Sequence, residues 1–190
     1  MKKYIVFYIS ITLLNAQAFE GMTLLSPAAG GNGGGGTSYS YLIDNDLNEI
    51  NTWSHPYGSA SMPYLNPDST LIYPYRVPNP TMSVGGVGGG ISKYSWEGDL
   101  LWDYRVSDET YQHHHDVEPL PNGNILVIAW EKKTAAEAYA AGRQSIDNSL
   151  NEMWATAILE LEPVGNDDAN IVWEWHIWDH LIQDEDPDAD

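Results

Sequence analysis

Three consecutive histidines followed by an aspartate are the residues of this sequence best suited to chemistry. They are His113, His114, His115 and Asp116, and they include half of the six histidines of the chain. Neutral imidazole is a nucleophile near neutral pH, because its pKa is about 6.5. A protonated imidazole can give a proton to a leaving group. This cluster is therefore the first candidate for a catalytic site.

The residues around the cluster predict a β-hairpin that would position it. Leu-Pro-Asn-Gly-Asn at 120–124 is typical of a tight turn, because proline presets one dihedral angle and Asn-Gly supplies the positive φ. The apolar run Ile125 to Trp130 that follows is typical of a buried strand. The histidines then lie at the end of the preceding strand, on a rigid scaffold.

Strand alternation divides the three histidines between two faces. It places His113 and His115 on one face and His114 on the other. We expect His115 to face the site, with Asp116 orienting a neighbouring imidazole. His114 would take its place if strand twist or a bulge exchanged the two faces.

A second histidine motif lies near the end of the chain, in the sequence WEWHIWDH. Alternation puts Trp173, Trp175 and Ile177 on one face, and we expect this face in the core. His176 lies on the other face, and His180 could reach the site from a turn after the strand. Both histidines are candidate catalytic residues.

Three further residues are candidates for substrate binding. Tyr111 and Trp130 flank the histidine hairpin and could stack on an aryl group, although core packing is an alternative for Trp130. Arg76 ends a predicted strand and could bind an anionic group, and a surface role is equally consistent with its position.

Metal binding is an alternative use of the same side chains. His176 and His180 have the i, i+4 spacing of helical zinc ligands, but the Glu-x-x-His pattern of zinc proteases is absent. A metal-dependent enzyme would use His113, His115 and Asp116. Our leading interpretation assigns no metal ligand and requires no cofactor.

Repeated hairpins predict the fold class. Segments 41–53, 91–102 and 158–175 each read as two alternating strands around a turn, with tryptophan on the second strand. Segments 64–72 and 119–126 form a second recurring hairpin. Four short strands in about 50 residues is the content of a β-propeller blade. We predict an all-β fold of four-stranded antiparallel blades, with boundaries near 38–88, 89–154 and 155–190, the last incomplete.

One helix is expected within this pattern. Residues 132–153 lengthen one repeat, and Thr134 with Glu137 forms a capping box before an alanine-rich run. Gly142 is a plausible stop. Because two to three blades cannot close a ring, their outer strands would stay exposed. We expect either an incomplete chain or assembly with further chains, including copies of itself.

The remaining features of the sequence limit where the protein can be located and which partners it can bind. Residues 1–18 have the charged, apolar and small-residue regions of a signal peptide, which predicts export to the periplasm or beyond. Residues 19–37 form a glycine-rich lead-in. The formal net charge of −19 disfavours nucleic acid and anionic lipid, and no run is long enough for a membrane span. The chain has no cysteine, so thiolate chemistry is excluded.

The sequence resembles a known family in three blocks, QHHHDVEPLPNGNILVIAWEKK, AAEAYAAGR and IVWEWHIWDHLIQD. They are similar to the bacterial arylsulfotransferases, over most of residues 38–186. The resemblance implies an exported, six-bladed β-propeller that transfers a sulfuryl group between phenols through a sulfated histidine, without a nucleotide sulfate donor. The family's His-His-Asp motif matches His114, His115 and Asp116, and His113 is an extra histidine. Other family blocks that carry site histidines belong to later blades and are not found in this chain.

Two classes of function therefore stay open beside the metal enzyme. The first is an aryl-sulfate sulfotransferase acting on a small aryl sulfate and a phenol. The second is a non-catalytic propeller module that binds phenolic or carbohydrate ligands.

Overall fold

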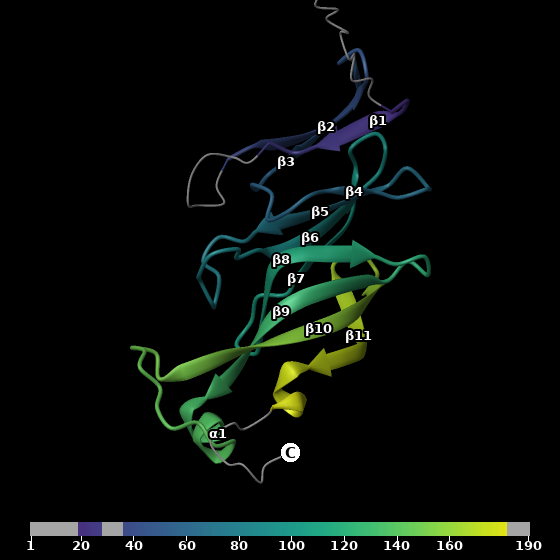
Figure 1. The fold of residues 1–190 in the computed structure, drawn as a ribbon. Helices are drawn as coiled ribbons and strands as arrows, with labels where there is room; N and C mark the ends of the chain where they lie inside the picture. The colour runs from purple at the N-terminus through teal and green to yellow at the C-terminus, as the bar shows by residue number, and fades with distance from the viewer. Residues whose placement is uncertain (1–18, 28–35, 182–190) are drawn as a thin grey trace, which may run out of the picture.

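The chain folds into three antiparallel β-sheets that lie face to face (Figure 1). The computed structural model describes residues 19–27 and 36–181. The first sheet contains β1 (Met22–Leu25), β2 (Ser38–Asp44) and β3 (Glu49–His55). The second contains β4 (Tyr64–Leu65), β5 (Leu71–Arg76), β6 (Gly89–Tyr94) and β7 (Leu100–Arg105). The third contains β8 (Tyr111–Pro119), β9 (Ile125–Thr134), β10 (Glu152–Val164) and β11 (Asp168–His176).

The predicted all-β antiparallel fold is confirmed, and two of the three sheets in the described residues have the predicted four strands. Strands follow one another in sequence order within every sheet, so that each four-stranded sheet is two consecutive hairpins. The turn after β8 forms as its residues indicate: the Leu120 amide donates to the Asn124 carbonyl, and Gly123 has a φ of 91°. The number of blades in a closed ring stays a prediction.

The sheets divide the chain at different places from the expected blades. Their boundaries fall in 56–63 and 106–110, whereas 88/89 lies between β5 and β6 and 154/155 lies inside β10. A tryptophan repeat sets the period of the pattern, but it does not reveal which hairpin begins a sheet. The lead-in also contains a strand, because β1 pairs with β2. The predicted signal peptide lies outside the described residues.

The inserted helix is present as α1 (Ala135–Ala140), and a short 3-10 helix, η1 (Ile177–His180), follows β11. The Thr134 amide donates to a Glu137 carboxylate oxygen at 2.7 Å, and the Glu137 amide donates to the Thr134 hydroxyl at 3.3 Å. This is the predicted capping box, and Gly142 follows the helix at a φ of 95°. Neither helix among the described residues has the length and apolar character needed to cross a membrane.

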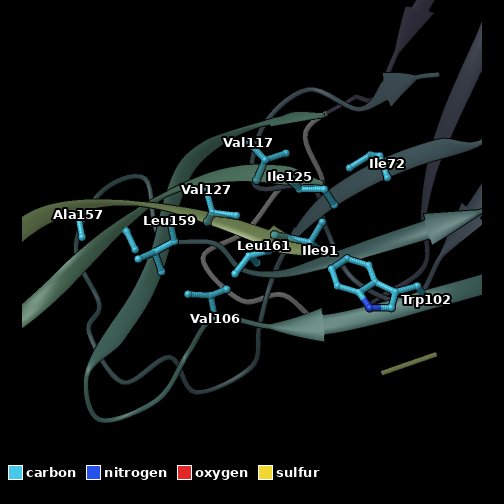
Figure 2. Packing of buried hydrophobic residues seen from close by; sticks show 11 residues of the cluster. Ile72, Ile91, Trp102, Val106, Val117, Ile125, Val127, Ala157, Leu159 and Leu161 are labelled. Carbon is cyan, nitrogen blue, oxygen red and sulfur yellow. The ribbon is translucent and has the colours of Figure 1, made fainter. Parts of the chain in front are cut away.

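Two apolar layers hold the sheets together. The layer between the second and third sheets is mostly aliphatic, and Figure 2 shows Ile72 and Ile91 of the second sheet beside residues of the third. The layer between the first and second sheets is mostly aromatic, with Trp53 against the tyrosines of β5 and β6. Burying such side chains is the main stabilising contribution in a chain without disulfides.

Candidate functional site

A bulge in β8 places the three histidines in three different environments. β8 pairs with β9 from Tyr111↔Glu131 to His113↔Ala129, and pairing resumes only at Val117↔Val127. The residues between them, His114, His115 and Asp116, stand opposite Ile128 alone, and His115 adopts a φ of 57°. Strict alternation is therefore interrupted, and the expectation that His113 and His115 share one face does not hold. The sequence left this outcome open, because a bulge can exchange the faces on which His114 and His115 lie.

His113 is a buried structural residue. Its ring is fully buried on the face toward the second sheet, and its Nδ1 accepts the Gly89 amide proton at 2.9 Å. Burial lowers the pKa of His113 to about 4, so the ring is neutral at pH 7. Because Nδ1 accepts, the single proton is on Nε2, an atom without a hydrogen-bond partner among the described residues.

His114 and His115 form a hydrogen-bonded imidazole pair. Their Nδ1 atoms are 2.8 Å apart and their rings are nearly perpendicular, at 86°. His114 is buried and stacks on Trp130, with ring centroids 4.4 Å apart. Burial, followed by the nearby His115, lowers the pKa of His114 to about 4. His115 is exposed, so the pair joins a buried neutral ring to one that solvent and substrate can reach.

A glycine-rich loop before β6 supports this bulge. The His115 amide donates to the Gly86 carbonyl at 2.7 Å, and the Gly88 amide donates to the His113 carbonyl at 3.1 Å. A methyl group on Gly86 would lie 2.3 Å from the His115 ring, and one on Gly88 would lie 2.5 Å from Nδ1 of His113. Sequence reasoning missed these positioning residues. The signal was present in VGGVGGG at 84–90, because closely spaced glycines mark close backbone approach.

Asp116 contacts hydroxyl groups. One carboxylate oxygen accepts from the Ser61 hydroxyl at 2.8 Å and the other from the Tyr64 hydroxyl at 2.9 Å. Burial, together with this hydrogen bond, raises the pKa of Tyr64 to about 12. Asp116 therefore ties the bulge to β4 and to the segment before it. Contrary to expectation, no histidine ring in the described part of the chain donates to the Asp116 carboxylate, because the bulge turns this carboxylate toward the second sheet.

His176 belongs to a separate ionic cluster. Its Nδ1 lies 3.2 Å from a Glu131 carboxylate oxygen and its Nε2 lies 3.5 Å from Glu174. Glu131 also accepts from Lys133 at 2.7 Å. The Tyr111 ring lies 6.4 Å from His176, and burial raises the pKa of Tyr111 to about 12, aided by the charge of Glu131. A carboxylate therefore contacts each of the two ring nitrogens of His176.

The strand register separates this ionic cluster from the imidazole pair. His176 pairs with Ala157 and lies on the face of the third sheet that packs on the second, as His113 does. His114 stacks on Trp130, which lies on the opposite face because alternate residues of β9 point to opposite sides. His176 and the His114–His115 pair therefore do not form one site.

The remaining candidates are dispersed. His180 lies in η1 and stacks on Trp175 at 5.2 Å. Arg76 ends β5 in the second sheet, and its Nε is buried without a hydrogen-bond partner among the described residues. The face expected in the core is largely outside it: Trp173 is 48% exposed and Ile177 is 42% exposed. β11 is an edge strand of the third sheet, and within the described residues no sheet packs on its outer face, so the side chains on that face stay exposed.

An open pocket of about 190 Å³ adjoins the bulge. Its lining is mostly aliphatic and includes two acidic residues, which gives it space for an apolar ring beside an acidic edge. The lining residues are Asp116, Val117, Glu118, Leu126, Val127, Ile128 and Ile158.

Family models, curated proteins and solved structures give no match to this chain. The assignment of a site therefore depends on the side chains themselves. Within the described part of the chain, no three acidic, histidine or cysteine side chains are grouped in a way that could hold a metal ion. The two features that could act on a ligand are the imidazole pair and the pocket beside it.

Proposed function

We propose that this protein transfers a sulfuryl group from an aryl sulfate to a phenol through an imidazole, without a nucleotide sulfate donor. The observation that carries the proposal is the 2.8 Å contact between the exposed His115 and the buried His114. The sequence blocks that resemble arylsulfotransferases supply the reaction class, and the local chemistry is consistent with it.

In the proposed reaction His115 is the nucleophile, and His114 is the partner that orients it. His115 uses Nδ1 in the pair, which leaves Nε2 to react. When Nε2 attacks sulfur, the bond from sulfur to the aryl oxygen breaks and its electron pair leaves with the phenolate. The His115 ring then carries a positive charge, and its Nδ1–H donates to Nδ1 of His114. The same logic orients the histidine of a hydrolase triad.

His114 is not assigned as the acid in this reaction. With a pKa of about 4, it is neutral at pH 7. The sequence-based expectation of a second, protonated imidazole is not met by this residue, because burial disfavours its charged form. The departing phenolate takes its proton from water. The acceptor phenol gives its proton to the hydroxide that this leaves, and its phenolate then attacks sulfur. The bond from sulfur to Nε2 breaks and returns its electron pair to His115.

The pocket beside the bulge is the proposed aryl site. Leu126, Ile128 and Ile158 provide an apolar surface for a ring. Glu118 pairs with Leu126 and lies on the pocket's side of the sheet, so its carboxylate repels the sulfate end and favours binding with the sulfate directed away from it. This charge arrangement also disfavours phenols that carry a second anionic group.

The test is sulfate transfer from a chromogenic aryl sulfate to a phenol by the whole chain. We expect His115→Asn to lower turnover by at least about 10³-fold, because the nucleophile is lost. His180→Asn is the matched control, since that ring lies in η1 and is not part of the pair. Unchanged turnover in His115→Asn would remove this assignment.

The second candidate function is a non-catalytic module for phenolic or carbohydrate ligands. It is favoured by the burial of His113 and His114, which leaves one accessible imidazole in the cluster. Titration with an aryl sulfate, followed by product analysis, separates the two functions. Saturable binding without any released phenol supports the module.

A further inference from the structure

The positive charge that develops on the imidazole pair has no carboxylate beside it. In a hydrolase triad an aspartate stabilises the charged histidine ring. Here both carboxylate oxygens of Asp116 accept from hydroxyl groups, those of Ser61 and Tyr64, at 2.8 and 2.9 Å. Within the described part of the chain, no acidic side chain forms a hydrogen bond or an ion pair with the ring of His114 or His115. The charged pair is therefore stabilised by another group.

Trp130 is the aromatic side chain in contact with the pair. Its ring centroid lies 4.4 Å from that of His114, and the two rings are inclined by only 23°, so the imidazole stacks on the face of the indole. This face carries negative charge density, and a cation within about 6 Å of it is attracted, most strongly where water is excluded. His114 is only 6% exposed, which excludes most water from the contact.

The hydrogen bond within the pair brings part of the charge onto this stack. The two Nδ1 atoms are 2.8 Å apart, a length typical of a charge-assisted hydrogen bond once one ring is positive. Burial opposes positive charge on His114 and lowers its pKa to about 4. The indole face acts in the opposite direction, because it attracts the charged ring more strongly than the neutral one. Trp130 thus offsets part of the desolvation that burial of His114 causes.

The other ionisable groups around His114 are few. Those of its own strand are Tyr111, His113, His115, Asp116 and Glu118. The loop 77–88, which packs on the bulge and pairs Val87 with His114, contains none. Those of β9 have partners elsewhere: Glu131 contacts His176 and Lys133, and Lys132 contacts Glu152. The indole face of Trp130 is therefore the feature of the neighbouring strand that favours charge on the pair.

We propose that Trp130 is a positioning residue that favours the positively charged form of the imidazole pair through the stacked His114 ring. For its role in catalysis the inference rests on the proposed sulfuryl transfer, because that reaction places the charge on His115. Trp130 raises the proton affinity of the pair, and the same contact stabilises the sulfated intermediate. This role differs from aryl binding and from core packing, the two roles that the sequence allowed for Trp130.

The first experiment follows the histidine ring signals of the whole chain by NMR over a pH series without substrate, with His115→Asn to identify the signals of the pair. Trp130→Leu keeps an apolar side chain but removes the aromatic face. It is expected to lower the pH at which the pair takes up its first proton by about 0.5 unit or more. Trp130→Phe keeps a weaker aromatic face and should lower this pH by less. Equal shifts in the two variants, or no shift in Trp130→Leu, would overturn the proposal.

Two further comparisons keep the titration decisive. If Trp130→Leu does not fold, Trp130→Phe is compared with the unaltered chain, and the absence of any shift to lower pH overturns the proposal. Trp154→Leu is the matched control, because this ring lies on the same face, 5.5 Å from that of Trp130, and stacks on Trp130 instead of His114. It should shift the first protonation by less than Trp130→Leu does. A shift of equal size would show a general loosening of this face and would contradict the assigned role.

Steady-state kinetics of sulfate transfer separate this role from aryl binding. Trp130→Leu is expected to lower kcat by about 3-fold or more and to leave KM nearly unchanged, because the positive charge develops as Nε2 attacks and is absent from the bound substrate. A raised KM with an unchanged kcat would assign Trp130 to the aryl group and overturn the proposal. The NMR titration needs no turnover. Unchanged turnover in His115→Asn would therefore remove the proposed reaction without altering the result of the titration.

Discussion

Two regions of the molecule each stack a buried histidine on an aromatic ring, and they differ in what the histidine contacts next. Between the first and second sheets, His55 lies 3.5 Å from the Tyr73 ring at an interplanar angle of 9°, and its Nε2 bonds the Ser40 hydroxyl at 2.9 Å. At the bulge of β8, His114 stacks on Trp130 and bonds His115.

Burial alone does not separate these two histidines. Desolvation lowers the pKa of both His55 and His114 to about 4, and both are almost inaccessible. The difference lies in the partner: Ser40 is fully buried, whereas His115 is exposed. A perturbed histidine is thus a functional candidate only where it connects to a group that a ligand can reach.

The largest expected effect compares the two aromatic partners. Tyr73→Ala removes a fully buried ring from the aromatic layer and is expected to cost about 3–5 kcal/mol of unfolding free energy. Trp130→Ala removes a ring that is only half-buried and should cost clearly less. Denaturant unfolding of both variants measures the difference. Equal losses of unfolding free energy would contradict the distinction between the closed aromatic layer and the open outer face of the third sheet.

The pH dependence of stability is the next largest effect. An unfolded histidine takes up its proton near pH 6.5, but the folded His55 does so only near pH 4. Stability is therefore full above pH 6.5 and falls by about 1 kcal/mol per pH unit for each such histidine as the pH drops toward 4. His55→Phe and His114→Phe should each lower the slope of stability against pH by the contribution of one proton taken up on unfolding. Unfolding measured at several pH values gives this slope. A slope unchanged in both variants would show that other groups cause it.

A smaller effect is expected at the glycines that support the bulge. Gly86→Ala places a methyl group against the His115 ring at a position with a φ of 84°, and should cost about 1–3 kcal/mol. Gly85→Ala is the matched control, since nothing lies within 4 Å of its added methyl group. The ring proton signals of His115 in NMR spectra should shift in the first variant and not in the second. Identical spectra would mean that the loop does not position this ring.

The smallest effect compares two serine hydroxyls. Ser40→Ala leaves a buried His55 nitrogen without its partner and should cost about 1 kcal/mol. Ser61→Ala removes a hydrogen bond to Asp116 at a solvent-exposed site, where water can replace the hydroxyl, and should cost less. Thermal unfolding of both variants provides the comparison, and a greater loss for Ser61→Ala would reverse it.

The hairpins could be predicted from sequence because their turns are specified locally. Asn122 and Gly123 encode one turn, and Thr134 with Glu137 encodes the start of α1. The placement of the histidines could not be predicted in the same way. Their faces depend on a bulge held by the Gly86 carbonyl, and that residue lies in the loop between β5 and β6 of a different sheet.

The same limit applies to the other candidate residues. His176 was expected near the first histidine cluster, but its position is set by Glu131 and by the register of β10 with β11. The strand β1 was missed because four residues beside a glycine-rich run carry too little alternation to be recognised. Local patterns predict which segments pair, and the pairing of distant segments decides which side chains meet.

The order of strands has a consequence for how the chain acquires its structure. Every sheet pairs only strands that are adjacent along the chain, so each hairpin closes a loop of modest length and loses little chain entropy in doing so. During synthesis, the second sheet has all of its strands before the first residue of β8 leaves the ribosome. The bulge with its imidazoles would then take shape on a surface that the earlier sheets have already prepared.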